Sequence, residues 1–185
     1  MLNKSIFLSL LFFAKLGFCC DSLQVINAFN NDIKEGVMRY EQSFLKENRE
    51  NIIGQIFYSQ PSKLKITTEK PFKSELIVNG EFIYRTDIEL NETLRYEYET
   101  IKNQIPAMIF LTDREKACSL LREQENQGFI SDFKISQKGN AQVEINYVDQ
   151  FSNPSRIILS NITHKAHNKE RIFEYNKLTN LVIME

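Results

Sequence analysis

Residues 54–84 read GQIFYSQPSKLKITTEKPFKSELIVNGEFIY, and this stretch decides the fold class. Its clearest run is Lys63–Thr68, in which Leu64 and Ile66 alternate with lysine and threonine. Alternation with a period of two places the apolar side chains on one face of a β-strand. Asn79-Gly80 lies between two further apolar runs and is the strongest hairpin signal in the chain. The stretch therefore predicts consecutive antiparallel strands with one buried face.

The strand pattern continues on both sides of this stretch. Leu94–Tyr98 alternates in the same way, and turn residues such as Lys138-Gly139-Asn140 and Ser152-Asn153-Pro154 separate further runs. These signals predict one long, curved antiparallel sheet. The remaining predicted strands are Val37–Leu45, Ile52–Ser59, Glu75–Val78, Glu81–Arg85, Phe129–Gln137, Ala141–Val148, Arg156–Thr163 and Glu170–Tyr175.

Two regions break the strand pattern and predict helices. Over residues 23–33, leucine, isoleucine and phenylalanine recur every three or four positions, which is the spacing of one helix face. In the middle of the chain, Pro106 opens a short apolar helix. A second, amphipathic helix is expected over 113–124, where Thr112 and Glu115 have capping-box spacing. We expect these helices to lie across a single face of the sheet.

The composition predicts one ordinary folded domain. The 185 residues contain 23 Lys+Arg against 24 Asp+Glu, for a formal net charge of -1, and 42% are hydrophobic. No cluster of basic residues and no glycine-rich phosphate loop is visible in the sequence. Nucleic acids and nucleotides are therefore not expected as partners.

The first 20 residues have the layout of a secretory signal peptide. Lys4 precedes an apolar run at 6–13, and small residues follow at 17–20. The apolar run is too short to span a bilayer. We therefore predict export, with residues 1–20 acting as the signal peptide and residues 21–185 forming a single domain.

The cysteines near the cleavage point leave two alternatives open. Gly17 and Cys19 would also suit a cut before Cys20, whereas residues 16–19 weakly resemble a lipobox. A lipid on Cys19 or Cys20 would turn a free protein into an anchored one. The remaining cysteine, Cys118, is expected to be a buried thiol unless Cys20 is retained and pairs with it.

No residue pattern in the sequence points to catalysis, a metal or another cofactor. His164 and His167 are three residues apart, but they lie in a polar stretch that predicts a solvated loop. Cys118 lies on the apolar side of a predicted helix and has no protease-like motif around it. The carboxylates between residues 113 and 125 alternate with basic residues, as on a solvated helix face. We expect a protein that is not an enzyme and that holds no cofactor.

Gly54–Pro61 resembles the periplasmic outer-membrane lipoprotein-carrier (LolA) family, in which a glycine and a strand precede a basic residue and a proline. The likeness continues without a gap after Pro61 and covers about residues 29–111, with a weaker likeness to the end. Further positions that match by spacing or apolar character are Leu64, Ile66, Pro71, Leu76–Gly80, Ile83, Tyr84, Asp87, Leu90, Glu92 and Pro106–Met108.

The resemblance implies an α+β fold, namely an incomplete, half-open antiparallel β-barrel or curved sheet covered by an N-terminal helix and lid helices. It implies a monomeric periplasmic carrier and chaperone that binds the acyl chains of lipoproteins in an apolar cavity. The implied partners are acylated lipoproteins, an inner-membrane ABC-type lipoprotein release complex, and an outer-membrane receptor or the outer membrane itself. The alternative is a membrane-anchored lipoprotein acceptor of the LolB type, or an envelope-sensing module, on the same fold.

The resemblance also implies which side chains would form the cavity, although an alternating strand suits a filled core as well. The expected wall consists of apolar strand residues: Phe57, Leu64, Ile66, Leu76, Val78, Ile83, Tyr96 and Tyr98. The expected lid consists of apolar helix residues: Pro106, Met108, Ile109, Phe110 and Leu111.

Some positions depart from the family pattern. Gln60 occupies the place of the basic residue that the family links to one-way transfer, so we expect lid control or release to differ. Thr86 replaces a common aromatic residue, and Glu92 replaces a glutamine. These changes put the transfer of individual residue roles in doubt more than the fold.

Overall fold

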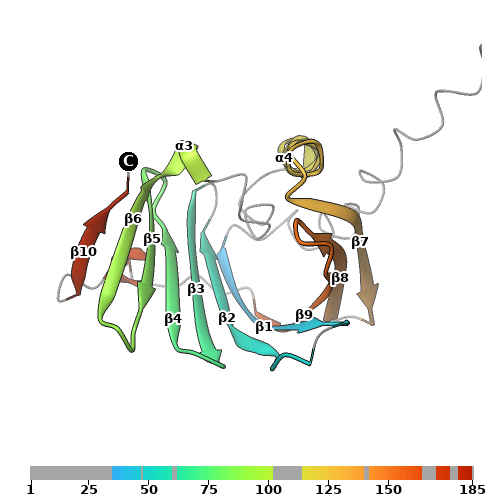
Figure 1. The fold of residues 1–185 in the computed structure, drawn as a ribbon, viewed down its shortest axis with the longest axis horizontal. Helices are drawn as coiled ribbons and strands as arrows, with labels where there is room; N and C mark the ends of the chain where they lie inside the picture. The colour runs from blue at the N-terminus through green and yellow to red at the C-terminus, as the bar shows by residue number, and fades with distance from the viewer. Residues whose placement is uncertain are drawn as a thin grey trace, which may run out of the picture.

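The main feature of the protein is one large, curved sheet that does not close on itself (Figure 1). Across the sheet the strand order is β10-β6-β5-β4-β3-β2-β1-β9-β8-β7, so among the described residues β10 and β7 form its two edges. The computed structural model describes residues 35–46, 48–59, 62–101, 114–139, 142–163, 170–175 and 179–184.

Neighbouring strands of the sheet are antiparallel except for β10, which runs parallel to β6. The strands are β1 (Glu35–Phe44), β2 (Ile52–Ser59), β3 (Lys63–Lys70), β4 (Ser74–Val78), β5 (Phe82–Asp87), β6 (Glu92–Glu97), β7 (Ile130–Lys138), β8 (Gln142–Asp149), β9 (Pro154–Thr163) and β10 (Asn180–Ile183).

Short helical elements accompany the sheet in the described part of the chain: α3 (Tyr98–Ile101), α4 (Arg114–Asn126) and the 3-10 helix η3 (Glu170–Phe173). Figure 1 shows α4 over the open side of the curve that β1, β9, β8 and β7 form. Leu121 of α4 is fully buried among strand side chains, which holds this helix on the sheet. None of the helices within the described residues has the length and apolar character needed to cross a membrane.

Two predictions about single elements are wrong. The segment Glu170–Tyr175, predicted as a strand, contains η3 instead, because Ile172 and Phe173 are neighbours that both pack against one sheet face. Strand β10 was not predicted, since its four residues are too few to display an alternation. By contrast, α4 matches the helix predicted over residues 113–124. The predicted helices at 23–33 and 106–111 lie outside the described residues.

Two glycines on the first two strands each face a tyrosine across the ladder. Tyr40 is paired with Gly54, and Tyr58 is paired with Gly36. A Cβ atom on Gly36 would lie 2.7 Å from the Tyr58 hydroxyl, so each tyrosine ring occupies the space above its glycine. Irregular register between β2 and β3 begins at the same place, between Ile53 and Gly54. Glycines and bulges of this kind bend a sheet. The strands that carry them, β1 and β2, lie in the curved part of the sheet in Figure 1.

The core consists of two clusters on opposite faces of the sheet. The larger cluster, called the inner face below, joins strand residues to Cys118 and Leu121 of α4. The smaller cluster joins Ile77 and Tyr84 to Phe173 of η3, on what is called the outer face below. Successive strand residues point to opposite faces, which is why Ile77 and its neighbour Val78 belong to different clusters.

Replacing Gly54 with alanine should lower the free energy of unfolding by about 3 kcal/mol, because overpacking against fixed backbone is costly. The new Cβ would overlap the carbonyl oxygen of Thr67 and would lie 2.7 Å from Cε1 of Tyr40. Gly36→Ala is the control, since its Cβ would meet only atoms of the Tyr58 side chain. Urea denaturation should show a clearly smaller loss for the control, and equal losses would contradict this account of the bend.

Candidate functional site

The inner face brings together seven of the eight predicted wall residues. Leu64, Val78 and Ile83 are fully buried and form part of the core itself. The other four are only partly buried and pack against that core: Ile66, Leu76, Tyr96 and Tyr98. The inner face of β3 to β6 is therefore a filled layer with a half-exposed apolar surface above it.

Phe57 does not lie with these residues. It packs against the outer cluster, whereas its neighbours Ile56 and Tyr58 are buried on the inner face. Adjacent residues in a regular strand cannot point the same way, so Phe57 cannot line the same wall. The alternation in the sequence already indicates this, because Phe57 lies between Ile56 and Tyr58 and must point to the opposite side of the strand from both.

The inner face also contains half-buried apolar residues that the sequence analysis did not single out. They extend the apolar surface from β3–β6 across the rest of the sheet and onto both helices: Ile52, Ile101, Leu120, Tyr147, Ile157 and Ile162. The alternation in β8 could have indicated Tyr147, since Val143 and Ile145 precede it on the same face. Ile162 follows the positive-φ residue Asn161, where the alternation in β9 is interrupted and gives no guide.

A few polar groups lie within this apolar face. The Tyr40 hydroxyl and Thr68 Oγ1 are 2.8 Å apart and share a hydrogen bond. Gln42 lies on the same strand as Tyr40, and its Nε2 donates a hydrogen bond to the Tyr147 hydroxyl of β8 at 3.0 Å. Burial raises the pKa of both phenols above its usual value, so Tyr40 and Tyr147 stay neutral at physiological pH. Both hydroxyls are hydrogen-bonded within the protein, so the face carries no charge at these points.

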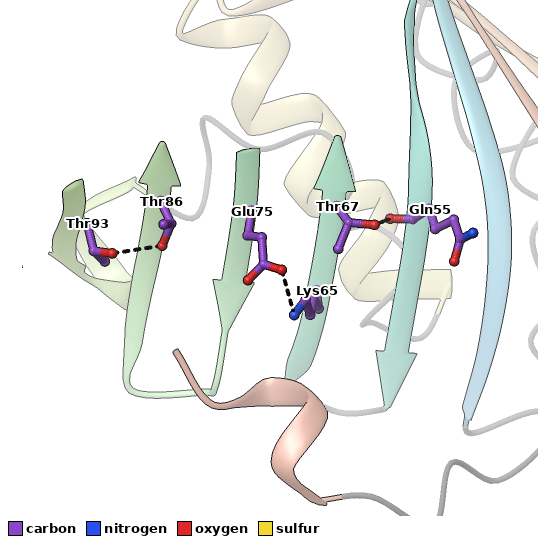
Figure 2. A network of polar contacts seen from close by, with 6 residues as sticks. All are labelled: Gln55, Lys65, Thr67, Glu75, Thr86 and Thr93. Carbon is purple, nitrogen blue, oxygen red and sulfur yellow. Dashed lines mark hydrogen bonds and ion pairs between the residues drawn. The ribbon is translucent and has the colours of Figure 1, made fainter. Parts of the chain in front are cut away.

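The outer face has a different character. Figure 2 shows Lys65 and Glu75 on adjacent strands, where Lys65 Nζ lies 3.0 Å from Glu75 Oε1. Thr86 and Thr93 share a buried hydrogen bond of 2.9 Å on the next pair of strands (Figure 2). The aromatic part of this face is covered, since η3 packs on it and Tyr175 stacks on Tyr84 with ring centroids 4.4 Å apart. The outer face has four partly buried apolar residues beside its small cluster, whereas the partly buried apolar surface of the inner face extends over most of the sheet and both helices.

The remaining predicted site residues lie outside the described residues. This applies to Gln60 and to the lid positions Pro106, Met108, Ile109, Phe110 and Leu111. It also applies to His164 and His167. Within the described part of the chain, no group of three or more His, Cys, Asp or Glu residues is placed to hold a metal ion.

Cys118 is buried, as expected, but it is disulfide-bonded and not a free thiol, which is the exception that the sequence analysis left open. The other two cysteines of the sequence, Cys19 and Cys20, lie outside the described residues. A thiol that is held in a disulfide is not available as a nucleophile. The disulfide instead gives α4, which lies over the inner face, a covalent attachment.

This arrangement defines a class of protein: a large, curved, unclosed sheet with a helix over its half-exposed apolar face is a half-open β-barrel. Residues 32–146 match the family described as outer membrane lipoprotein carrier protein LolA. The match covers more than half of the chain, and the chain belongs to this family.

A solved structure agrees on the fold. An uncharacterized conserved protein from Thermus thermophilus is 7% identical, covers 89% of this chain and 98% of its own, and superposes with a TM-score of 0.52. A LolA superfamily protein from Nitrosomonas europaea is also 7% identical and covers 84% of this chain and 96% of its own, with a TM-score of 0.46. No curated protein matches the chain in sequence.

Cys118 should not react with iodoacetamide in the unreduced protein, even after denaturation, and should react fully after reduction. Reduction should also lower the melting temperature, because a disulfide typically stabilises a fold by about 2 to 4 kcal/mol. Cys118→Ser is the control, since reduction should not change its melting temperature. Alkylation of Cys118 in unreduced, denatured protein would refute the bond.

Proposed function

We propose that this protein is a periplasmic carrier that binds the acyl chains of lipoproteins and transfers them from the inner membrane toward the outer membrane. The observation that carries the proposal is the inner face, on which half-buried apolar side chains cover a filled core. Membership of the lipoprotein-carrier family supports the same reading. In this role the protein is a chaperone for lipid-modified proteins and not an enzyme.

The physics of acyl-chain transfer suits such a face. Each methylene group that leaves water contributes about 0.8 kcal/mol, so about ten buried methylenes would supply about 8 kcal/mol. This affinity needs apolar area and no special residue. Half-buried residues such as Leu76 and Tyr96 can remain partly exposed at little cost, because the layer beneath them is fully packed.

The proposed transfer cycle needs a step that empties the face. We assign this step to competition between cargo and the lid residues Met108, Ile109, Phe110 and Leu111, which would cover the same apolar surface when no cargo is bound. Gln60 stands where the family has a basic residue, and it would change the balance of this competition. Acylated lipoproteins, an inner-membrane ABC-type release complex and an outer-membrane acceptor are the partners that this cycle requires.

Export fits both the N-terminal sequence and the disulfide. A signal peptide cut before Cys20 would keep one of the two possible partners of Cys118, whereas a cut after Cys20 would remove both. We therefore favour the cut before Cys20. A disulfide also suits an oxidising compartment such as the periplasm.

Ile66→Glu should abolish binding of a fluorescent diacylated lipopeptide, with at least a roughly tenfold loss of affinity, because it places a carboxylate on the inner face. Ile66 is preferable to Leu64, whose side chain is fully buried, so that Leu64→Glu would be expected to unfold the protein. The measurement is fluorescence titration of the full chain.

The matched control for this experiment is Val148→Glu. Val148 is half-buried like Ile66, but in β8 it alternates with Ile145 and Tyr147 and so points to the opposite face. Circular dichroism must show both variants folded. If Ile66→Glu binds the lipopeptide as well as Val148→Glu does, the inner face is simply core and the proposal fails.

A further inference from the structure

Five large apolar side chains are exposed in turns and at strand ends, where they support no core. They range from 47% exposed for Ile88 to 74% for Phe151. The five, called the apolar rim below, are Leu45, Phe72, Ile88, Leu90 and Phe151. The other exposed large apolar side chains among the described residues belong to the C-terminal stretch Leu181–Met184.

Strand register places all five at the same end of the sheet. Leu45 follows β1 where Phe44 pairs with Ser155, which is the end at which the β8–β9 turn carries Phe151. The turns that carry Phe72 and Ile88 join β3 to β4 and β5 to β6, and antiparallel pairing puts both at this end. Figure 1 shows these two turns along the lower edge of the sheet.

Backbone hydrogen bonds connect the turns in pairs. The Leu45 amide donates to the Pro154 carbonyl at 2.9 Å, which joins the β1–β2 connection to the β8–β9 turn. The Ile88 amide donates to the Lys73 carbonyl at 3.2 Å, which joins the β5–β6 turn to the β3–β4 turn. Neighbouring rim residues are therefore held close to one another although they are far apart in the sequence.

Two aspartates fix the shape of the most exposed turns. Asp87 Oδ1 accepts hydrogen bonds from the Glu89 and Leu90 amides, both at 3.0 Å. Asp149 Oδ1 accepts from the Phe151 amide at 2.9 Å and from the Asn153 amide at 2.8 Å. Side-chain to backbone bonds of this type preset a turn. The apolar tips are thus displayed in a defined backbone conformation before any binding partner arrives.

Charged side chains of both signs, which include the exposed Glu50 and Glu92, surround the rim, so its contact with lipid would depend on the apolar tips. Phe72 stands between the exposed lysines Lys70 and Lys73, and Leu45 is followed by the exposed Lys46. Exposed carboxylates at Glu69 and Glu89 keep the rim from being strongly basic. An aromatic or aliphatic tip flanked by lysine inserts between headgroups while the ammonium groups contact phosphates.

We propose that the apolar rim is a membrane-contact surface that inserts its tips into the interface of a lipid bilayer. Separate tips on four turns do not form the contiguous, complementary patch that a stable protein partner needs. A bilayer accepts separate insertions, and strand register places the four turns along one edge of the sheet. The role of this contact in loading or delivering cargo rests on the proposed function, whereas the contact itself does not.

The test is flotation of the full chain with vesicles of phosphatidylethanolamine and phosphatidylglycerol. The triple variant Phe72→Ser, Leu90→Ser, Phe151→Ser should float about tenfold less than the wild type, because three apolar side chains no longer leave water. Its melting temperature should be unchanged, since these side chains are exposed. The matched control, Val182→Ser, Ile183→Ser, Met184→Ser, removes exposed apolar residues away from the rim and should float like the wild type.

Two outcomes would overturn the inference. In one such outcome the wild type does not float with protein-free vesicles, which would indicate that the rim binds a protein and not a bilayer. In the other, the triple variant floats as well as the wild type. Lipopeptide binding measured in the absence of vesicles separates the two proposals. A rim variant that binds lipopeptide normally but does not float supports the contact surface, and Ile66→Glu should still float even though it loses lipopeptide.

Discussion

The fit of two tyrosine rings over two glycines on β1 and β2 is the constraint on which the rest of the structure depends. Tyr40 over Gly54 and Tyr58 over Gly36 fill the inner face at the point where the sheet bends. A Cβ atom at Gly54 would overlap the Thr67 backbone on β3, and one at Gly36 would displace the Tyr58 ring. Because the sheet bends here, β9, β8 and β7 turn back toward α4 and the inner face becomes the inside of a curve (Figure 1).

The bend makes the two faces unequal. On the outer face, a short helix and one aromatic stack are enough to cover the apolar patch around Tyr84, and polar pairs such as Lys65 with Glu75 occupy much of the remainder. On the inner face, the core continues upward into side chains that are only half-buried. If further residues of the protein covered these side chains completely, the fold would be more stable, but no apolar surface would remain for a ligand. A carrier needs this second layer to be incomplete.

The sequence predicts the elements that have a regular local pattern, and it does not predict those that depend on contacts with residues distant in the chain. The alternation of Leu64 and Ile66 and the Asn79-Gly80 hairpin predicted the central strands, because both signals are local. Phe57 was misplaced because apolar character was counted without its parity relative to Tyr58. The segment at 170–175 forms a short helix and not the predicted strand, because its apolar residues pack against Ile77 and Tyr84, which are far away in the sequence. Strand β10 has only four residues, too few to predict a strand, and it forms through parallel pairing with β6.

An incomplete inner layer also weakens the attachment of whatever lies over it, and α4 is the element concerned. Among residues 118–126, the part of α4 whose side chains are described, Leu121 and Gln124 are fully buried, so few large side chains of this part fix the helix to the sheet. Hydrophobic contact alone would let such a helix lift whenever cargo enters beside it. The disulfide at Cys118 changes this, because it gives the helix a covalent attachment that adds no apolar contacts to the face. A covalent link can hold the cover in place while the surface beneath it stays open to a ligand, and that combination is difficult to reach by packing.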